Sequence, residues 1–348
     1  MPPIAESIGM ERSRPNGKLT FCLALAGLCL LGGSVPAHGD SLSGAYLQGP
    51  IGEPIVPLPT SLDFDRDRAS LGEKLFYDRR LSHDGSLACV SCHNLGEGGD
   101  DGLPLPRTAK GRSGEVNTPT IFNSALSFRL GWRGTYRRLA DQVDADISDP
   151  RLMNSSWDEV LGKLRGDSGY RADFGRNYAD GISRQNVLDA LSAFHRSLIT
   201  PNARFDDYLR GRDDALTEAE KSGYRLFKSL GCVSCHQGRN IGGNLFQKVG
   251  IFKDYFTSRG NLREIDFGRF LDTGAQRDLF VFRVPSLRNV AVTAPYFHDG
   301  SVADLGEAVR KMGEIQLGES LTDEEVGLIV QFLHSLTGEY KGRPIMSE

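Results

Sequence analysis

The chain has 348 residues, a length that allows one large domain or two domains of ordinary size. Hydrophobic residues make up 39% and charged residues 25% of the sequence, which excludes a disordered chain, a collagen-like fibre and a multi-span membrane protein. The net charge of −4 excludes the strongly basic surface of a nucleic-acid-binding protein. Six cysteines would allow three disulfides, but their positions predict a different use.

The first 37 residues have the pattern of a secretory signal peptide. Three basic residues precede an apolar run of about 15 residues, and a small residue, Ala37, follows. The alternative, a single membrane anchor, would need roughly 20 apolar residues. We therefore expect cleavage after Ala37. This removes Cys22 and Cys29 and leaves a periplasmic chain with four cysteines and no membrane span.

Helices are expected to dominate the rest of the chain. Residues 38–61 are rich in glycine and proline and are predicted to form an extended N-terminal strap. A capping-box pattern then predicts a helix that begins at Ser70, and the same pattern recurs at Thr217 and Thr322. Alternating apolar and polar residues, which are typical of strands, are nearly absent. The predicted fold class is therefore mainly α.

An internal repeat divides the chain into two parts. Residues 75–76, Leu-Phe, precede one Cys-Val-Ser-Cys-His segment, and residues 226–227, again Leu-Phe, precede a second one. About 100 residues after each copy, apolar residues at helical spacing predict an amphipathic helix, over 187–198 and over 326–336. The repeat predicts one small helical domain per copy, 62–203 and 204–348.

Each repeat contains Cys-x-x-Cys-His, the attachment signature of c-type haem. The two thiols of such a motif form thioethers with the haem vinyl groups, and the adjacent imidazole binds the iron. The alternatives are a redox-active cysteine pair or half of a zinc site. Two identical copies in an exported chain favour haem, because covalent attachment prevents its loss outside the cell. The predicted attachment and iron-binding residues are Cys89, Cys92 and His93 in the first copy and Cys232, Cys235 and His236 in the second.

The sixth ligand of each iron decides its chemistry, since a methionine raises the reduction potential and an open position allows peroxide to bind. Met312 follows the second motif and is the natural sixth ligand there, with core packing as the alternative. The loop 96–114 after the first motif holds no histidine or methionine, so we expect an open iron in the first domain. Three other histidines are predicted to lie in a loop or to serve packing and hydrogen bonding: His83, His195 and His334.

Besides the haem motifs, five segments occur in order: 71–82, 117–123, 216–227, 284–290 and 293–301. In this combination the sequence resembles the bacterial dihaem cytochrome c peroxidase family, which includes the MauG-type maturases. The resemblance covers about residues 62 to 337, nearly the whole mature chain.

The resemblance implies two cytochrome c-like domains, with a peroxide-reacting haem in the N-terminal domain and a low-spin, electron-transfer haem in the C-terminal one. It implies that Met312 is the distal ligand, which favours the peroxidase branch because MauG-type enzymes have a tyrosine there. Trp132 matches the tryptophan that carries electrons between the haems. A calcium ion would be bound by the Asn117 side chain and by carbonyls near Thr293 and Pro295, which are hard oxygen ligands.

Two departures from the family pattern concern the first haem. Many members carry a switchable distal histidine after the first motif, but residues 107–112 contain none, so the first haem is expected to need no reductive activation. The family also has a glutamate in its distal pocket where this chain has Leu152. Peroxide cleavage needs a group that moves a proton between the two oxygens. Asp144 or Asp146 could replace the glutamate. We favour Asp146, because it stands where the family tends to have proline and its side chain is therefore expected to project into the pocket.

We therefore predict a periplasmic cytochrome c peroxidase that reduces hydrogen peroxide with electrons from a small cytochrome c or cupredoxin. One alternative is a MauG-like oxidase that modifies a tyrosine or tryptophan of a partner protein. Loss of the pocket glutamate is compatible with it, and Met312 speaks against it. The other is a dihaem electron-transfer cytochrome, which an open first iron would serve poorly. Family members are often homodimers, although no surface stripe in the sequence identifies a dimer face.

Overall fold

The computed structural model describes residues 52–108 and 114–346, so the predicted signal peptide and most of the predicted strap lie outside the described residues. The described residues belong to one compact unit. They are mainly helical, with two small antiparallel sheets of two strands each, which confirms the predicted mainly-α class. Within this part of the chain, no helix is long and apolar enough to cross a membrane.

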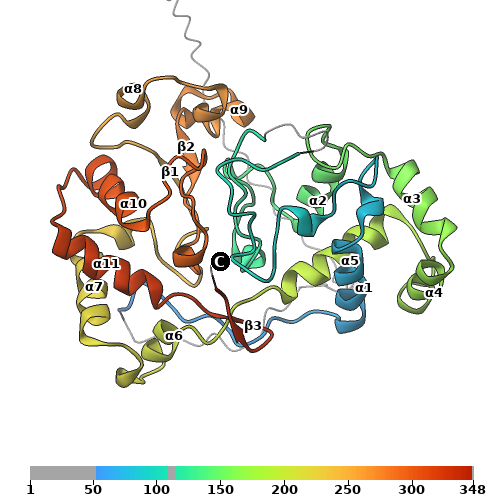
Figure 1. Cartoon of the computed structure of the whole chain (residues 1–348), viewed down its shortest axis with the longest axis horizontal. Coiled ribbons are helices and arrows are strands. Elements are labelled where there is room, and N and C mark those ends of the chain that lie inside the picture. The colour runs from blue at the N-terminus through green and yellow to red at the C-terminus, as the bar shows by residue number, and fades with distance from the viewer. Residues whose placement is uncertain (1–51, 109–113, 347–348) are drawn as a thin grey trace, which may run out of the picture. The chain divides into compact units, whose positions relative to one another are not determined.

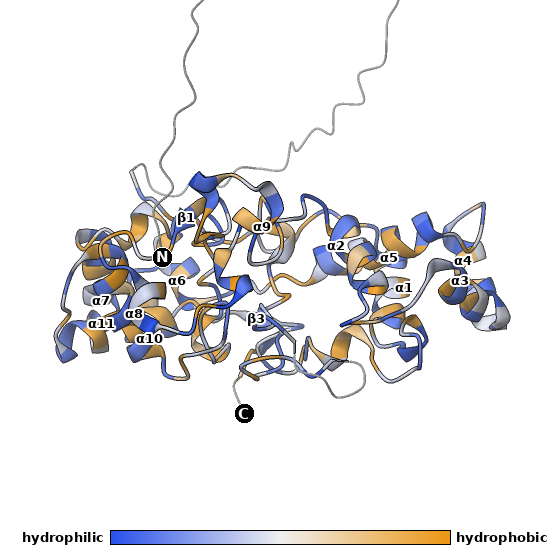
Figure 2. Cartoon of the chain, turned by 90° about the horizontal axis from the view of Figure 1, so that it is seen from above, coloured by the Kyte–Doolittle hydropathy of each residue, from blue (hydrophilic) through white to orange (hydrophobic). Residues whose placement is uncertain are grey.

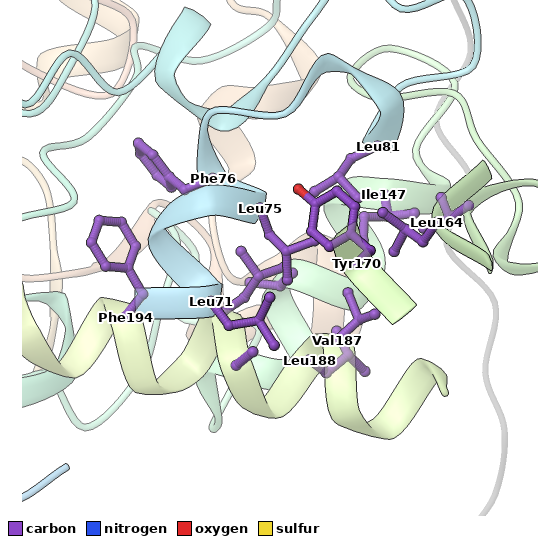
Figure 3. Packing of buried hydrophobic residues seen from close by; sticks show 14 of the residues in the cluster. Leu71, Leu75, Phe76, Leu81, Ile147, Leu164, Tyr170, Val187, Leu188 and Phe194 are labelled. Carbon is purple, nitrogen blue, oxygen red and sulfur yellow. The ribbon is translucent and has the colours of Figure 1, made fainter. Parts of the chain in front are cut away.

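The first five helices group around one hydrophobic core (Figure 1). Figure 3 shows this core from close by, with Leu71 and Leu75 of α1 among the side chains of α5, including Val187 and Leu188. The bounds of these helices are α1 Arg66–Phe76, α2 Leu139–Ser148, α3 Trp157–Gly166, α4 Ser168–Asn177 and α5 Arg184–Ser197.

The later helices group mainly around a second core, and an aromatic cluster lies beside α8 and β2. Many of the helices carry both hydrophilic and hydrophobic residues, as expected for helices with one buried face (Figure 2). The helices are α6 Arg204–Leu209, α7 Glu218–Ser229, α8 Tyr255–Arg259, α9 Phe270–Thr273, α10 Leu305–Met312 and α11 Asp323–His334. The strand pairs are β1 Phe246–Lys248 with β2 Val281–Arg283, and β3 Glu339–Tyr340 with β4 Arg343–Pro344.

Side-chain caps determine where three of the helices begin. The capping boxes predicted at Thr217 and Thr322 are confirmed at the starts of α7 and α11. The predicted start at Ser70 is wrong, because α1 begins at Arg66. The carboxylate of Asp65 accepts hydrogen bonds from two backbone N–H groups of the first turn of α1 and so caps the helix earlier.

The internal repeat reappears as two equivalent helix crossings. Helix α1 crosses α5 at Gly72, where an added Cβ atom would lie 2.0 Å from the carbonyl oxygen of Ala190. Helix α7 crosses α11 at Gly223, where an added Cβ atom would lie 2.0 Å from the carbonyl oxygen of Leu328. Only glycine allows helices to approach this closely. Each crossing therefore holds the helix before a Cys-x-x-Cys-His motif against the amphipathic helix far downstream of it.

The two ends of the described chain are exchanged between the cores. Ile55 of the strap is buried in the second core. Ile345, at the end of the β3–β4 hairpin, is buried in the first core, against which Tyr340 also packs. The predicted domain 204–348 thus contributes some of its last residues to the core built from 62–203.

Thr200, in the connection between α5 and α6, joins the two halves through buried hydrogen bonds. Its Oγ1 accepts from Asn123 Nδ2 at 2.8 Å and from Asn289 Nδ2 at 3.1 Å, and its N–H donates to Asn123 Oδ1 at 3.0 Å. The two asparagines are equivalent in the repeat, since each has a positive φ (60° and 64°) and each precedes a single 3-10 turn.

Candidate functional site

The two Cys-Val-Ser-Cys-His segments adopt the same local structure. Cys89–Ser91 and Cys232–Ser234 each form one 3-10 turn. In both copies the histidine N–H donates to the carbonyl of the first cysteine at 2.9 Å. This tight turn gathers the two thiols and the imidazole of each motif. All four cysteines are free and half-buried.

Burial keeps three of these thiols protonated. It raises the pKa of Cys89 to about 12 and the pKa values of Cys92 and Cys232 to about 11. Cysteine pairs that exchange disulfides react as thiolates and have lowered pKa values, so these motifs are poorly suited to that chemistry. Within the described residues, neither motif belongs to a cluster of His, Cys, Asp or Glu side chains arranged for a metal ion, which also disfavours zinc.

Both motif histidines are buried and held by backbone carbonyls. His93 Nδ1 lies 3.0 Å from the Gly99 oxygen, and His236 Nδ1 lies 3.4 Å from the Ile241 oxygen. When Nδ1–H donates, Nε2 keeps the lone pair that binds iron. Burial lowers the pKa of both rings, that of His236 to about 4, so both are neutral at neutral pH.

One cavity of about 680 Å³ is lined by both motifs. Most of its lining side chains are hydrophobic, and the amphipathic helices contribute Leu191 and His195 from α5 and Ile329 and Leu333 from α11. Free thiols, neutral imidazoles and an apolar cavity are what two c-type haems need. The residues present therefore fit this prosthetic group.

Two methionines line the cavity. Met312 is the last residue of α10, in the second half. Met153 lies in the first half, where its N–H donates to the carbonyl of Asp146 at 3.3 Å. Sequence reasoning gave Met153 no role as a ligand.

The three histidines predicted to be non-ligands lie in different surroundings. The side chain of His83 is 60% exposed, and its Nδ1 lies 2.9 Å from a carboxylate oxygen of Glu159. His334 is exposed at the end of α11. His195 is buried and lines the cavity, and burial lowers its pKa to about 3.

The two candidate carboxylates of α2 have different environments. Asp144 accepts hydrogen bonds from Arg184 Nε at 2.9 Å and from Trp157 Nε1 at 2.7 Å. Asp146 lines the cavity and forms no side-chain hydrogen bond with the described residues. Burial, with a smaller contribution from Asp149, raises the pKa of Asp146 to about 7. Of the two, Asp146 is therefore the one available to react with a small molecule in the cavity.

Leu152 occupies a turn after α2, where its N–H donates to the Asp149 carbonyl at 3.0 Å. It is not among the residues that line the cavity. Its apolar side chain therefore offers no proton-transferring group. Two carboxylates of the first half line the cavity, Asp100 and Asp146, and Asp146 is the one near Leu152 in the sequence.

Trp132 lies on the cavity wall and is fixed by its indole nitrogen. Nε1 donates to the Asn117 carbonyl at 2.8 Å. The Asn117 N–H in turn donates to the His298 carbonyl at 2.9 Å, and the rings of Trp132 and His298 are in edge contact. The predicted electron-transfer residue is thus joined to a buried histidine that sequence reasoning did not assign a role.

His298 belongs to a buried charged network. Its Nε2 lies 2.7 Å from Asp266 Oδ1, and Arg259 pairs with both Asp266 and Asp299. The imidazole and the two carboxylates are close enough to hold a metal ion, but the guanidinium already supplies their cation. The segment 293–301 marked His298 in the sequence, whereas nothing marked Asp266.

The three residues predicted to bind calcium all line the cavity: Asn117, Thr293 and Pro295. Asn117 Nδ2 donates to the Leu103 carbonyl at 3.0 Å. Its Oδ1 accepts no hydrogen bond from the described residues and stays available to a cation. Calcium binding itself stays a prediction.

Comparisons with known proteins agree with this site. A family model described as di-haem cytochrome c peroxidase matches residues 66–214. The chain is 41% identical over 289 residues to cytochrome c peroxidase Ccp of Escherichia coli (strain K12), which covers 83% of this chain but 62% of that protein's length. It is 38% identical over 288 residues to cytochrome c551 peroxidase of Nitrosomonas europaea, covering 82% of this chain and 85% of that one.

MauG proteins are also similar. The methylamine utilization protein MauG of Methylophilus methylotrophus is 32% identical over 300 residues, covering 81% of this chain and 86% of that one. Among solved structures, a MauG-like protein associated with microbial copper homeostasis is 29% identical with a TM-score of 0.70, covering 85% of this chain and 96% of that one. The diheme peroxidase BthA from Burkholderia thailandensis E264, at 20% identity and a TM-score of 0.65, shares the fold.

Proposed function

This chain belongs to the di-haem cytochrome c peroxidase family, and on that premise we propose that it reduces hydrogen peroxide to water with electrons from a small redox protein. The predicted family is confirmed, and the predicted enzyme class agrees with the names of relatives that are 41%, 38% and 37% identical. The observation that carries the proposal is Asp146, a carboxyl with a raised pKa on the cavity wall near the first haem motif.

Two covalently bound c-type haems are part of this proposal. When bound, haem supplies an iron that binds peroxide and transfers electrons. His93 and His236 each offer Nε2 to an iron, and Met312 offers its sulfur to the second iron. Free thiols and neutral buried imidazoles support this assignment. The thioether residues are Cys89, Cys92, Cys232 and Cys235.

Asp146 is proposed to move the proton during cleavage of the oxygen–oxygen bond. Its carboxylate accepts a proton from one peroxide oxygen and returns it to the other, so that the departing oxygen leaves as water. The complete reaction consumes two electrons and two protons per peroxide and forms two waters. A pKa of about 7 suits this task, because the carboxyl can both accept and release a proton near neutral pH.

The remaining parts of the proposal concern electrons, calcium and location. Trp132 passes electrons between the two haem sites, supported by its place on the cavity wall and its fixed indole nitrogen. The donor is a small cytochrome c or cupredoxin. Calcium is held by Asn117 Oδ1 and the carbonyls near Thr293 and Pro295. The protein acts in the periplasm after removal of residues 1–37.

The decisive experiment mixes the purified dihaem protein with hydrogen peroxide and a reduced cytochrome c or cupredoxin, and follows donor oxidation by stopped flow. We expect peroxide-dependent oxidation well above that of free haem. Asp146→Asn should slow it by roughly 100-fold without loss of haem, because general acid–base catalysis contributes about this much. The proposal fails if no donor is oxidised faster than by free haem.

Asp144→Asn is the matched control, since it makes the same change two residues away in the same helix. Asp144 is engaged by Arg184 and Trp157, so its loss should leave the peroxide reaction within a few-fold of the unaltered protein. Equal losses in both variants would mean that damage to α2, rather than loss of a proton-transferring group, explains the effect of Asp146→Asn.

A MauG-like oxidase is the second candidate, and similarity to MauG at 32% identity favours it. Such an enzyme would draw the oxidising equivalents from a tyrosine or tryptophan of a partner protein. The same stopped-flow experiment separates the two: a peroxidase returns to its resting spectrum when reduced donor is added. An oxidised state that persists in the presence of donor would favour the partner-protein reaction.

A further inference from the structure

The two halves differ at one position on the cavity wall. The repeat pairs Phe194 of α5 with Phe332 of α11, because their Cβ atoms take the same place beside the two crossing glycines. The next residue is His195 in α5 and Leu333 in α11. Both line the cavity. A polar side chain thus stands in the first half where the second half has an apolar one.

His195 is buried without a polar partner. His195 is 8% exposed, and its Nδ1 is fully buried with no hydrogen-bond partner. Among the described residues, no hydrogen bond reaches either ring nitrogen. Leaving such a group unpaired carries a free-energy cost, because the nitrogen loses its hydrogen bonds to water and gains none in the protein. Leu333 avoids this cost and simply joins the second core. Packing alone therefore does not account for a histidine at this position.

The surroundings of His195 connect it to the first haem motif. Its ring is close enough to His93 for the two imidazoles to interact electrostatically. It also meets Phe76 edge-on, with ring centroids 6.3 Å apart. Cys89, His93 and His195 line the same cavity, so a group bound by the first motif would have His195 among its neighbours.

We propose that His195 makes a polar contact with the haem bound at His93 and lowers the reduction potential of that haem relative to the haem at His236. This rests on the proposed function in one respect, namely that both motifs bind haem. Ferric haem carries one more positive charge than ferrous haem, so a polar neighbour stabilises the ferric form, whereas an apolar neighbour such as Leu333 does not.

The test is a redox titration of the dihaem protein, followed by the absorption of each haem. His195→Leu, which installs the residue of the second half, should raise the potential of the first haem and leave that of the second unchanged. The reciprocal change, Leu333→His, should lower the potential of the second haem only. His195→Gln keeps a polar group and should stay close to the unaltered protein.

Each outcome decides the matter. An unchanged first potential in His195→Leu, or equal shifts of both haems, overturns the proposal. If His195→Leu does not retain two haems, Leu333→His decides alone, and an unchanged second potential overturns the proposal. The titration uses no peroxide, so the role of His195 can stand even if no donor is oxidised, and the peroxidase proposal can stand if the potentials do not shift.

Discussion

At the scale of single residues, the charge of Asp146 should make the reaction with peroxide sensitive to pH. Burial raises its pKa to about 7, so the carboxyl is mostly protonated below pH 7 and mostly ionised above it. Only the ionised form accepts a proton from peroxide. The rate of reaction with peroxide should therefore rise with pH around a midpoint near 7, and Asp146→Asn should remove this dependence.

A substitution of Asp149 provides a second test of the pH dependence predicted for Asp146. Its negative charge contributes to the raised pKa of Asp146. Asp149→Asn should shift the midpoint of the rate profile to lower pH, because less repulsion opposes ionisation of Asp146. Stopped-flow rates measured between pH 5 and pH 9 check both variants, and a profile that stays in place in Asp146→Asn would assign the titration to another group.

Met312 is expected to control the second iron. Met312→Ala should abolish the low-spin methionine-ligated signal, while Met312→His should retain a six-coordinate iron at a lower reduction potential, since methionine ligands raise it. Absorption and electron paramagnetic resonance spectra of the oxidised protein measure the first effect, and a redox titration measures the second. Survival of the methionine signal in Met312→Ala would overturn the assignment of Met312 and would point to ligation in the first half, where Met153 lines the cavity.

The sequence predicted the types of residue at the site better than their surroundings. The haem motifs follow from local patterns, whereas the role of Trp132 is implied by the family resemblance. Whether Asp144 or Asp146 faces the cavity depends on how α2 packs, because residues two apart point in different directions on a helix. The hydrogen bond between His298 and Asp266 joins residues that are 32 positions apart, and no local sequence pattern predicts it.

At the scale of elements, the two glycine crossings should be the most sensitive points of the helical framework. Gly72→Ala or Gly223→Ala would force a Cβ atom to 2.0 Å from a backbone carbonyl oxygen. We expect each to lower the free energy of unfolding by about 1–3 kcal/mol, typical of overpacking. Urea unfolding followed by circular dichroism measures this.

Gly162 provides the control for this prediction. It lies within α3, and a Cβ atom there would meet nothing within 4 Å. Gly162→Ala should raise the free energy of unfolding by roughly 0.5–1 kcal/mol, because alanine favours a helix over glycine. If all three substitutions raise the free energy of unfolding, helix propensity rather than the crossings governs their effect.

Element positions were predictable where the signals are local. Helices predicted over 187–198 and 326–336 are observed as α5 and α11, because apolar spacing reports directly on a buried face. The start of α1 was wrong for a specific reason: the pattern at Ser70 resembles a cap, but Asp65 supplies a better one upstream. When two residues could each cap the same helix, the sequence alone does not show which one does, because the choice depends on the conformation of the backbone before the helix.

At the scale of the whole molecule, Thr200 is expected to hold the halves together. Thr200→Val keeps the shape but removes the hydroxyl that accepts from Asn123 and Asn289, leaving two buried amide groups short of an acceptor. The free energy of unfolding should fall by about 1–3 kcal/mol. Thr200→Ser keeps the hydroxyl and should lose less. Equal losses in the two variants would mean that the methyl group contributes as much as the hydroxyl and would contradict a leading role of these hydrogen bonds.

The long-range organisation was only partly predictable. The repeat indicated two halves, and two cores are observed. The exchange of Ile55 and Ile345 between them was not foreseen. Such contacts join residues separated by most of the chain, and the hydrophobicity of a short extended segment does not say which core will accept it.

This exchange of ends also affects when each core can be completed during synthesis of the chain. Ile55 leaves the ribosome early, yet the helices that bury it, α7 and α11, come much later. The first core waits in the same way for Ile345. Neither core is complete until residues near the end of the chain have been made. Cys89 packs against the first core and Cys232 against the second, so we expect these thiols to be more accessible for permanent attachment to an incoming group before the cores are complete.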